Sequence, residues 1–226
     1  MKALSQELAR VLWLGGGTCS GQTSITQILS ARYDLCVYHC DDRFEEHKNR
    51  AQPDKHPAFY NAMFTSYKEM DWERFWMRPV ETLLEEQMAI YTDEFQMIVT
   101  DLLDMPHSRP ILAEGSALMP SCVKEVLTTS SAALWWIPEK TFHHRMYQQR
   151  GAWVRQILSQ CSDPRQAFDH WMERDITFAG YMASQAARVG LETLAIDVTR
   201  SIHENTERVE AHFGELLTDR DRHACS

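Results

Sequence analysis

A glycine-rich turn between an apolar run and a helical pattern constrains the fold more than any other stretch of this sequence. The apolar run covers residues 11–14, and the helical pattern covers residues 23–33, with Ile25 and Leu29 on one face. The turn between them reads Gly16-Gly17-Thr18-Cys19-Ser20-Gly21-Gln22-Thr23. A strand that enters a helix through such a turn, with a second apolar run after the helix, predicts a βαβ unit.

The spacing of this turn fits the pattern G-x-x-x-x-G-K-[ST], with Gln22 in place of the lysine. Glycines let the backbone wrap closely around phosphate oxygens, and the start of the following helix adds favourable partial charge. Thr23 stands where a hydroxyl group binds Mg²⁺ in this pattern. The turn therefore predicts a phosphate site at residues 16–23, and a tight packing turn without a ligand is the alternative.

Five short apolar runs alternate with helical patterns along the chain. They cover residues 11–14, 35–39, 110–113, 132–137 and 193–198. This alternation predicts an α/β fold in which a five-stranded parallel sheet is flanked by helices on both faces. A length of 226 residues suits one such domain with insertions better than two independent domains.

Two long segments between the predicted strands are expected to be insertions. Residues 43–79 begin charged and rich in proline, and they predict a helical insertion on the substrate side. Residues 140–190 are rich in arginine and aromatic side chains and predict a functional insertion, because an ordinary crossover is much shorter. Within the second segment, Asp163 and Pro164 predict the start of a long helix that Gly190 ends.

Aromatic and aliphatic residues recur at helical spacing between residues 72 and 102, with Pro79 expected to break the pattern. This spacing favours packing over a surface for stacking bases. The last helix is predicted to begin with a capping box at residues 201–204 and to turn Ile202, Val209 and Phe213 inward.

Composition and charge argue against several classes of partner. The chain carries 32 acidic and 23 basic side chains, a net charge of −9, which disfavours a nucleic-acid partner. Residues 1–10 are polar and the apolar run after them is short, so we expect no membrane span and a cytoplasmic location. The six cysteines are scattered and are expected to be reduced thiols.

Together these features resemble the adenylate-kinase and uridine-kinase branch of P-loop proteins, including chloramphenicol phosphotransferase-like and gluconate-kinase-like enzymes. The resemblance rests on residues 16–23 as a degenerate Walker A loop, Asp41-Asp42 after the second strand, Ile111-Leu112-Ala113-Glu114-Gly115, and the arginine-rich segment before the fifth strand. It implies that residues 1–226 form a single P-loop kinase-like domain. It also implies that ATP and Mg²⁺ bind and that phosphate is transferred to a small hydroxylated acceptor.

The same resemblance implies roles for three acidic residues. Asp41 is the expected general base for the acceptor hydroxyl, and Asp42 is an expected substrate ligand. Glu114 ends a strand at its carboxyl edge, where open parallel sheets bind ligands, and is an expected ligand for substrate or for the shell of Mg²⁺. The alternatives are a solvated turn or helix cap for the aspartates and a loop anchor for Glu114.

The resemblance also implies that residues 140–190 form a lid-like insertion whose arginines close over the phosphates, since a guanidinium fork matches phosphate geometry. The candidates are Arg145, Arg150, Arg155 and Arg174. We expect Arg174 to act in catalysis and Arg150 to bind substrate, while surface charges without a role are the alternative for each.

Three hypotheses about function follow. The first is an ATP-dependent kinase for a small molecule. The second is a nucleotide-binding protein without turnover, because Gln22 replaces the lysine. The third is a homodimer held by the aromatic helices around Trp72 and Trp171, with a loop that binds nothing.

Overall fold

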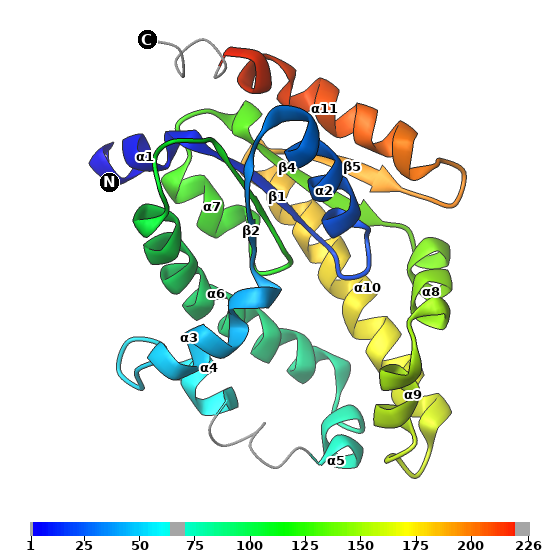
Figure 1. Cartoon of the computed structure of the whole chain (residues 1–226). Helices are drawn as coiled ribbons and strands as arrows, with labels where there is room; N and C mark the ends of the chain where they lie inside the picture. The colour runs from blue at the N-terminus through cyan, green and yellow to red at the C-terminus, as the bar shows by residue number, and fades with distance from the viewer. Residues whose placement is uncertain (1, 64–70, 220–226) are drawn as a thin grey trace.

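The computed structural model describes residues 2–63 and 71–219 (Figure 1). Five parallel strands form one sheet in the order β2-β3-β1-β4-β5. The strands are β1 (Val11–Gly16), β2 (Cys36–His39), β3 (Ile111–Glu114), β4 (Ala133–Pro138) and β5 (Glu192–Ile196). The predicted α/β fold with a five-stranded parallel sheet is therefore confirmed.

Helices connect the strands and build the rest of the chain. They are α1 (Lys2–Glu7), α2 (Gln22–Tyr33), α3 (Phe44–Arg50), α4 (Pro57–Asn61), α5 (Trp72–Trp76), α6 (Val80–Asp104), α7 (Pro120–Val126), α8 (Lys140–Gln149), α9 (Ala152–Leu158), α10 (Pro164–Arg188) and α11 (Ile202–Asp219). A short 3-10 turn, Asp41–Arg43, leads from β2 into α3.

The sheet is buried on both faces because its apolar side chains alternate along each strand. Leu12 and Leu14 of β1 pack in one cluster with residues of α2 and α11. Trp13 lies on the opposite face, in a cluster with residues of α6, α7 and α10. Figure 1 shows the two helical layers with the sheet between them.

The predicted helix signals at residues 163–190 and 201–204 are confirmed. The Asp163 side chain accepts hydrogen bonds from the amides of Arg165 and Gln166, and Pro164 is the first residue of α10. Ser201 and Glu204 form the reciprocal bonds of a capping box. The prediction for Ile202 is wrong, because this side chain is 46% exposed beside the turn that precedes α2.

The segment 140–190 has two structural parts. Helices α8 and α9 and the start of α10 share a cluster with α5, in which the rings of Trp76 and Trp171 are stacked 4.5 Å apart. Farther along α10, Phe178 and Met182 belong to the core beneath the sheet. Helix α10 therefore contributes both to the core of the sheet and to the cluster that it shares with α8 and α9, and the Trp171 ring, 4% exposed, packs inside the chain.

Within the segment 43–79, helices α3, α4 and α5 lie in the described residues, whereas residues 64–70 lie outside them. Phe59 of α4 packs against Ile90 and Met97 of α6. The predicted break at Pro79 is confirmed, since α5 ends at Trp76 and α6 begins at Val80. Among the described residues, the helices are all too short or too polar to cross a membrane.

Candidate functional site

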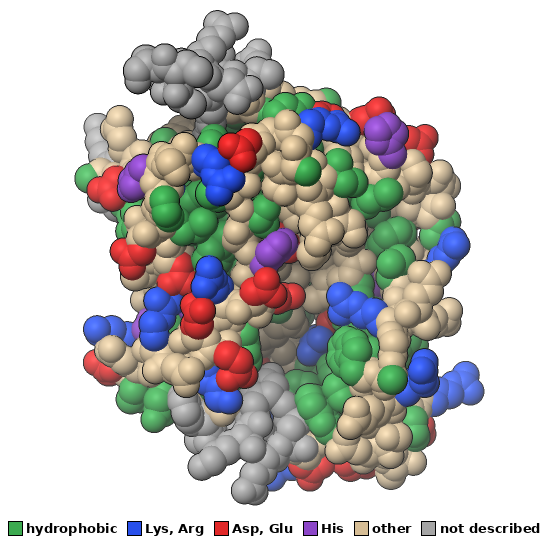
Figure 2. Space-filling view, in the orientation of Figure 1, with side chains coloured by type: hydrophobic (Ala, Val, Ile, Leu, Met, Phe, Trp, Pro, Cys, Tyr) green, Lys and Arg blue, Asp and Glu red, His purple; other side chains and the backbone are tan. Residues whose placement is uncertain are grey.

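A pocket of about 250 Å³ lies at the carboxyl end of the sheet, where β1, β2 and β3 end. It is lined by residues 18–24 and 114–116 together with Asp41, Tyr91, Met146 and Arg150. Figure 2 shows a hollow on this side of the molecule, with acidic side chains on one rim and basic ones on the other. The structure therefore brings the predicted loop together with three predicted site residues, Asp41, Glu114 and Arg150.

A larger groove of about 640 Å³ lies along β5 and α11. Its charged side chains already have partners: Arg208 donates to the Ala195 carbonyl oxygen, and His212 lies 3.1 Å from Glu192. Because its charges are used within the fold, this groove is the weaker candidate despite its size.

The turn between β1 and α2 is held on both sides by β4. The Gly17 amide donates to the Trp136 carbonyl oxygen over 3.1 Å, and the Trp136 indole Nε1 donates to the Ser20 carbonyl oxygen over 2.7 Å. A Cβ atom on Gly16, whose φ is +149°, would lie 2.1 Å from the Trp136 carbonyl oxygen. The backbone can approach β4 this closely only with glycine at position 16.

Helix α2 begins at Gln22 without a side-chain cap. Its N-cap residue is Gly21, with a left-handed φ of +88°, and Cys19 is also left-handed, with φ +57°. The first amides of a helix lack partners within the helix and carry partial positive charge. These amides lie beside the pocket, which makes this end of α2 suited to a negatively charged group.

The Gln22 side chain is turned back toward the sheet. Its Nε2 atom donates to the Leu14 carbonyl oxygen over 3.0 Å, and the residue is only 7% exposed. The Gly115 amide reaches the same carbonyl oxygen over 3.3 Å. Gln22 thus joins the start of α2 to the end of β1 and brings no charge to the pocket.

Thr23 and Glu114 form an oxygen-rich corner of the pocket. The Thr23 hydroxyl donates to Glu114 Oε1 over 3.0 Å, and His39 Nδ1 lies 2.6 Å from the same oxygen. Burial raises the pKa of Glu114 above its ordinary value, and the contacts with His39 and Thr23 offset only part of that effect. His39 was not predicted as a site residue, although its place at the end of β2 pairs it with Glu114 of β3.

The two aspartates that follow β2 have different surroundings. Asp41 lines the pocket, whereas Asp42 is exposed outside it. Partial burial raises the pKa of Asp41, and the charge of the nearby Arg150 opposes this rise. The side chain still keeps contact with solvent. Within the described part of the chain, no donor forms a hydrogen bond with the Asp41 carboxylate, so this acceptor is available to a ligand.

The two arginines predicted to act also differ. The Arg150 guanidinium lies over the rings of Tyr147 and Trp153, 5.5 and 5.9 Å from their centroids, and forms no ion pair with a described acidic residue. Arg174 does not line the pocket. It donates two hydrogen bonds to Asp175 and lies over the Trp76 ring, 4.8 Å from its centroid. Its guanidinium is therefore already bound within the fold.

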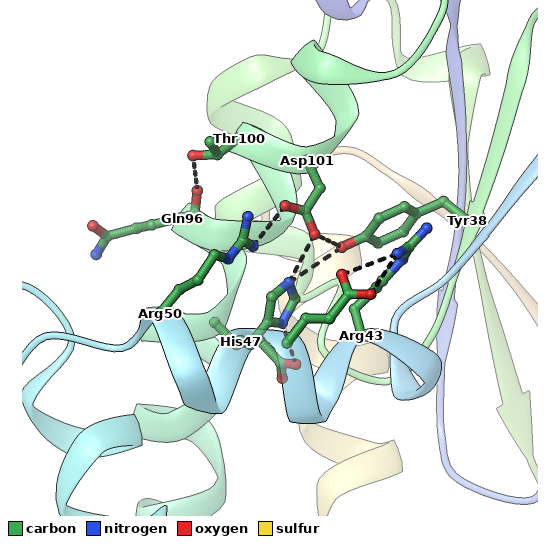
Figure 3. A network of polar contacts seen from close by, with 9 residues as sticks. Tyr38, Arg43, His47, Arg50, Gln96, Thr100 and Asp101 are labelled. Atoms are coloured by element: carbon green, nitrogen blue, oxygen red, sulfur yellow. Dashed lines mark hydrogen bonds and ion pairs between the residues drawn. The ribbon is translucent and has the colours of Figure 1, made fainter.

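A buried histidine fixes the segment that carries Asp41. Figure 3 shows His47 of α3 facing Asp101 of α6 and Tyr38 of β2. His47 Nε2 lies 3.0 Å from Asp101 Oδ2, and His47 Nδ1 lies 3.0 Å from Glu94 Oε1. Both ring nitrogens face carboxylates and both can donate only in the imidazolium form. The network therefore holds α3 against α6 by a buried charge.

The pKa shifts of His47 and Asp101 agree with this arrangement, whereas burial raises the pKa of Glu94 despite its contact with His47. Burial lowers the pKa of His47, but its hydrogen bonds to Asp101 and Glu94 outweigh burial and raise it. Burial raises the pKa of Asp101, yet His47, Tyr38 and Arg50 outweigh burial and lower it to about 2. The raised pKa of His47 favours its charged form, and the lowered pKa of Asp101 keeps that carboxylate ionised.

The sequence gives no significant match to a model of a protein family or to a curated protein.

We predict that His47→Gln destabilises the protein by about 3–5 kcal/mol at pH 6, because it leaves Glu94 and Asp101 without their buried cation. Because the pKa of His47 is raised in the folded protein, the charged ring contributes its full stabilisation below the ordinary histidine pKa of about 6.5. This stabilisation is lost as pH rises through the raised pKa. Urea unfolding at pH 6 and pH 9 should therefore show a smaller loss at pH 9.

The control for this prediction is His203→Gln on α11. His203 is exposed and lies 3.3 Å from Glu207, so its loss should change stability by less than about 0.5 kcal/mol. An equal effect of the two variants, or an effect of His47→Gln that does not depend on pH, would contradict the assignment of a buried imidazolium.

Proposed function

We propose that this protein binds ATP with Mg²⁺ at the loop before α2 and transfers the γ-phosphoryl group to a small hydroxylated molecule. The observation that carries the proposal is one pocket that combines the uncapped start of α2 with the Asp41 carboxylate and the Arg150 guanidinium, neither of which forms a hydrogen bond or ion pair with another described residue. Phosphoryl transfer needs three kinds of group: hydrogen-bond donors to the phosphates, a base and a cation.

The loop supplies the phosphate site in this proposal. Amides from Thr18 to Thr23 and the positive end of the α2 dipole would face the phosphates. An apolar side chain stands beside the loop, because Ile202, 46% exposed, has its Cδ1 atom 4.0 Å from the position of a Cβ atom on Gly21.

The residues present fit a magnesium ion. Mg²⁺ prefers oxygen ligands and is usually held by one or two protein groups, with water and substrate phosphates completing the shell. Thr23 Oγ1 and Glu114 Oε1, which lie 3.0 Å apart, are such oxygens. Bound Mg²⁺ would neutralise charge on the phosphates.

Asp41 and Arg150 would serve the transfer step. The acceptor oxygen forms a bond to the γ-phosphorus, the bond from that phosphorus to the β–γ bridging oxygen breaks, and ADP leaves. Asp41 takes the proton of the acceptor hydroxyl, and its raised pKa strengthens it as a base. Arg150 would lie against the transferring group and supply the cation that Gln22 does not.

One observation favours a second candidate, a nucleotide-binding protein without turnover. The Gln22 amide is engaged with the Leu14 carbonyl oxygen, so the loop itself offers no side-chain cation. Binding through backbone amides and Mg²⁺ would remain in this case, while the rate of transfer would fall by a hundredfold or more, on the order expected for loss of one donor.

We predict that the protein binds ATP in isothermal titration calorimetry and that Mg²⁺ strengthens binding. Gln22→Lys should tighten binding by about tenfold or more, because a charge-assisted hydrogen bond contributes about 1.5–3 kcal/mol. Gln27→Lys adds the same charge on α2 at a position that does not line the pocket and serves as the control. No ATP binding to the unmodified protein would refute both candidate functions.

We predict that Asp41→Asn lowers turnover by about a hundredfold or more, since the amide cannot accept the proton. Asp42→Asn, one residue outside the pocket, should stay within a few-fold of the unmodified protein. Turnover is measured as ADP release with a panel of nucleosides, sugars and amino alcohols. ATP binding without ADP release on any acceptor selects the second candidate, and equal losses in the two variants would contradict the role of Asp41.

A further inference from the structure

The buried carboxylate of Asp175 joins the loop to helices α8 and α10. Thr18 Oγ1 and the Tyr147 hydroxyl each donate a hydrogen bond to Asp175 Oδ2 over 2.7 Å. Arg174 donates to the other oxygen, Oδ1, from Nε over 2.9 Å and from Nη2 over 2.6 Å. Asp175 is 1% exposed, so these side chains rather than water satisfy it. A loop residue and a residue of α8 thus share one acceptor oxygen.

The Asp175 carboxylate is ionised. Burial raises its pKa, but Arg174, together with His143, Thr18 and Tyr147, outweighs burial and holds the pKa well below its ordinary value. A buried charge that loses one of its donors is left undersolvated, which is strongly unfavourable. Thr18 and Tyr147 are therefore held in place by the same charge, and displacement of one alters the hydrogen bonding of the other.

Tyr147 extends this connection to the pocket cation. The Arg150 guanidinium lies over the Tyr147 ring, 5.5 Å from its centroid. The Tyr147 hydroxyl also accepts a hydrogen bond from Trp171 Nε1 over 3.2 Å. The loop also passes close to α10 at Gly17, where an added Cβ atom would lie 3.1 Å from Ala179 Cβ. Contacts therefore run without a gap from the loop through Asp175 and Tyr147 to Arg150.

We propose that Asp175 is a positioning residue that couples the conformation of the phosphate-binding loop to the position of Arg150 on the opposite wall of the pocket. This inference rests on the proposed function for the role of the loop, while the coupling itself is a property of the chain without a ligand. When phosphates fill the loop, the hydrogen bond of Thr18 to Asp175 would keep Tyr147, and with it Arg150, directed at them. Arg174 would act by neutralising Asp175 instead of contacting the phosphates.

The coupling can be tested without a ligand by hydrogen exchange. Tyr147→Phe removes one donor from Asp175 and keeps the ring that supports Arg150. We expect the amides of residues 17–21 to exchange about tenfold faster in this variant, although the substitution lies in α8. Tyr181→Phe on α10 removes a hydroxyl that contacts Gln185 and should leave exchange in the loop unchanged. Unchanged exchange of residues 17–21 in Tyr147→Phe would overturn the proposal.

A matched pair at Thr18 tests the coupling with MgATP as the probe. Thr18→Val removes the hydroxyl at nearly constant shape, and Thr18→Ser keeps it. Thr18→Val should weaken MgATP binding by about tenfold, and adding Arg150→Ala to this variant should weaken binding no further. Thr18→Ser should keep the affinity of the unmodified protein, and adding Arg150→Ala to it should weaken binding as it does in the unmodified protein. A full effect of Arg150→Ala in the Thr18→Val background would overturn the coupling. If the unmodified protein binds no MgATP, the proposed function fails, and hydrogen exchange in Tyr147→Phe still decides the coupling.

Discussion

The close approach of the Gly16-Gly17 backbone to β4 is the constraint on which the candidate site depends. The Gly17 amide and the Ser20 carbonyl oxygen are both bound to Trp136, and a side chain at position 16 would collide with that strand. Because the turn is held there, α2 starts at Gln22 behind a glycine and keeps its first amides uncapped. The parallel sheet then places the ends of β2 and β3, with Asp41 and Glu114, next to the same helix end.

Charges near the pocket fall into two groups with different roles. Charges of the first group satisfy one another inside the fold: His47 binds Glu94 and Asp101, and Arg174 binds Asp175. Asp41 and Arg150 form the second group, and neither has a hydrogen-bonding partner in the described part of the chain. Paired charges are expected to hold the helices around the pocket, whereas unpaired charges in a pocket are available to a ligand. This division explains why Arg174 and Arg150 differ although both belong to one arginine-rich segment.

The sequence predicted the elements well because their signals are local. Apolar runs, the caps at Asp163 and Ser201, and the break at Pro79 each depend on a few neighbouring residues. The predicted place of Glu114 beside the loop followed from its position at the carboxyl edge of a parallel sheet, whereas that of Asp41 rested on the resemblance to kinases. Partners of side chains were not predictable in this way. His39 with Glu114, and Thr18 with Asp175, meet only in the folded chain, across strand pairing or helix packing.

The most direct test of the account is to record backbone amide resonances of the ¹⁵N-labelled protein by nuclear magnetic resonance during titration with MgATP. Phosphate binding at the start of α2 should give the largest changes at Gly21, Gln22 and Thr23, with downfield shifts of their amide protons as they donate to phosphate oxygens. Smaller changes should follow at Asp41 and Arg150, which line the same pocket. Saturating nucleotide that leaves the amides of residues 17–23 unmoved, or that shifts only residues along β5 and α11, would contradict it.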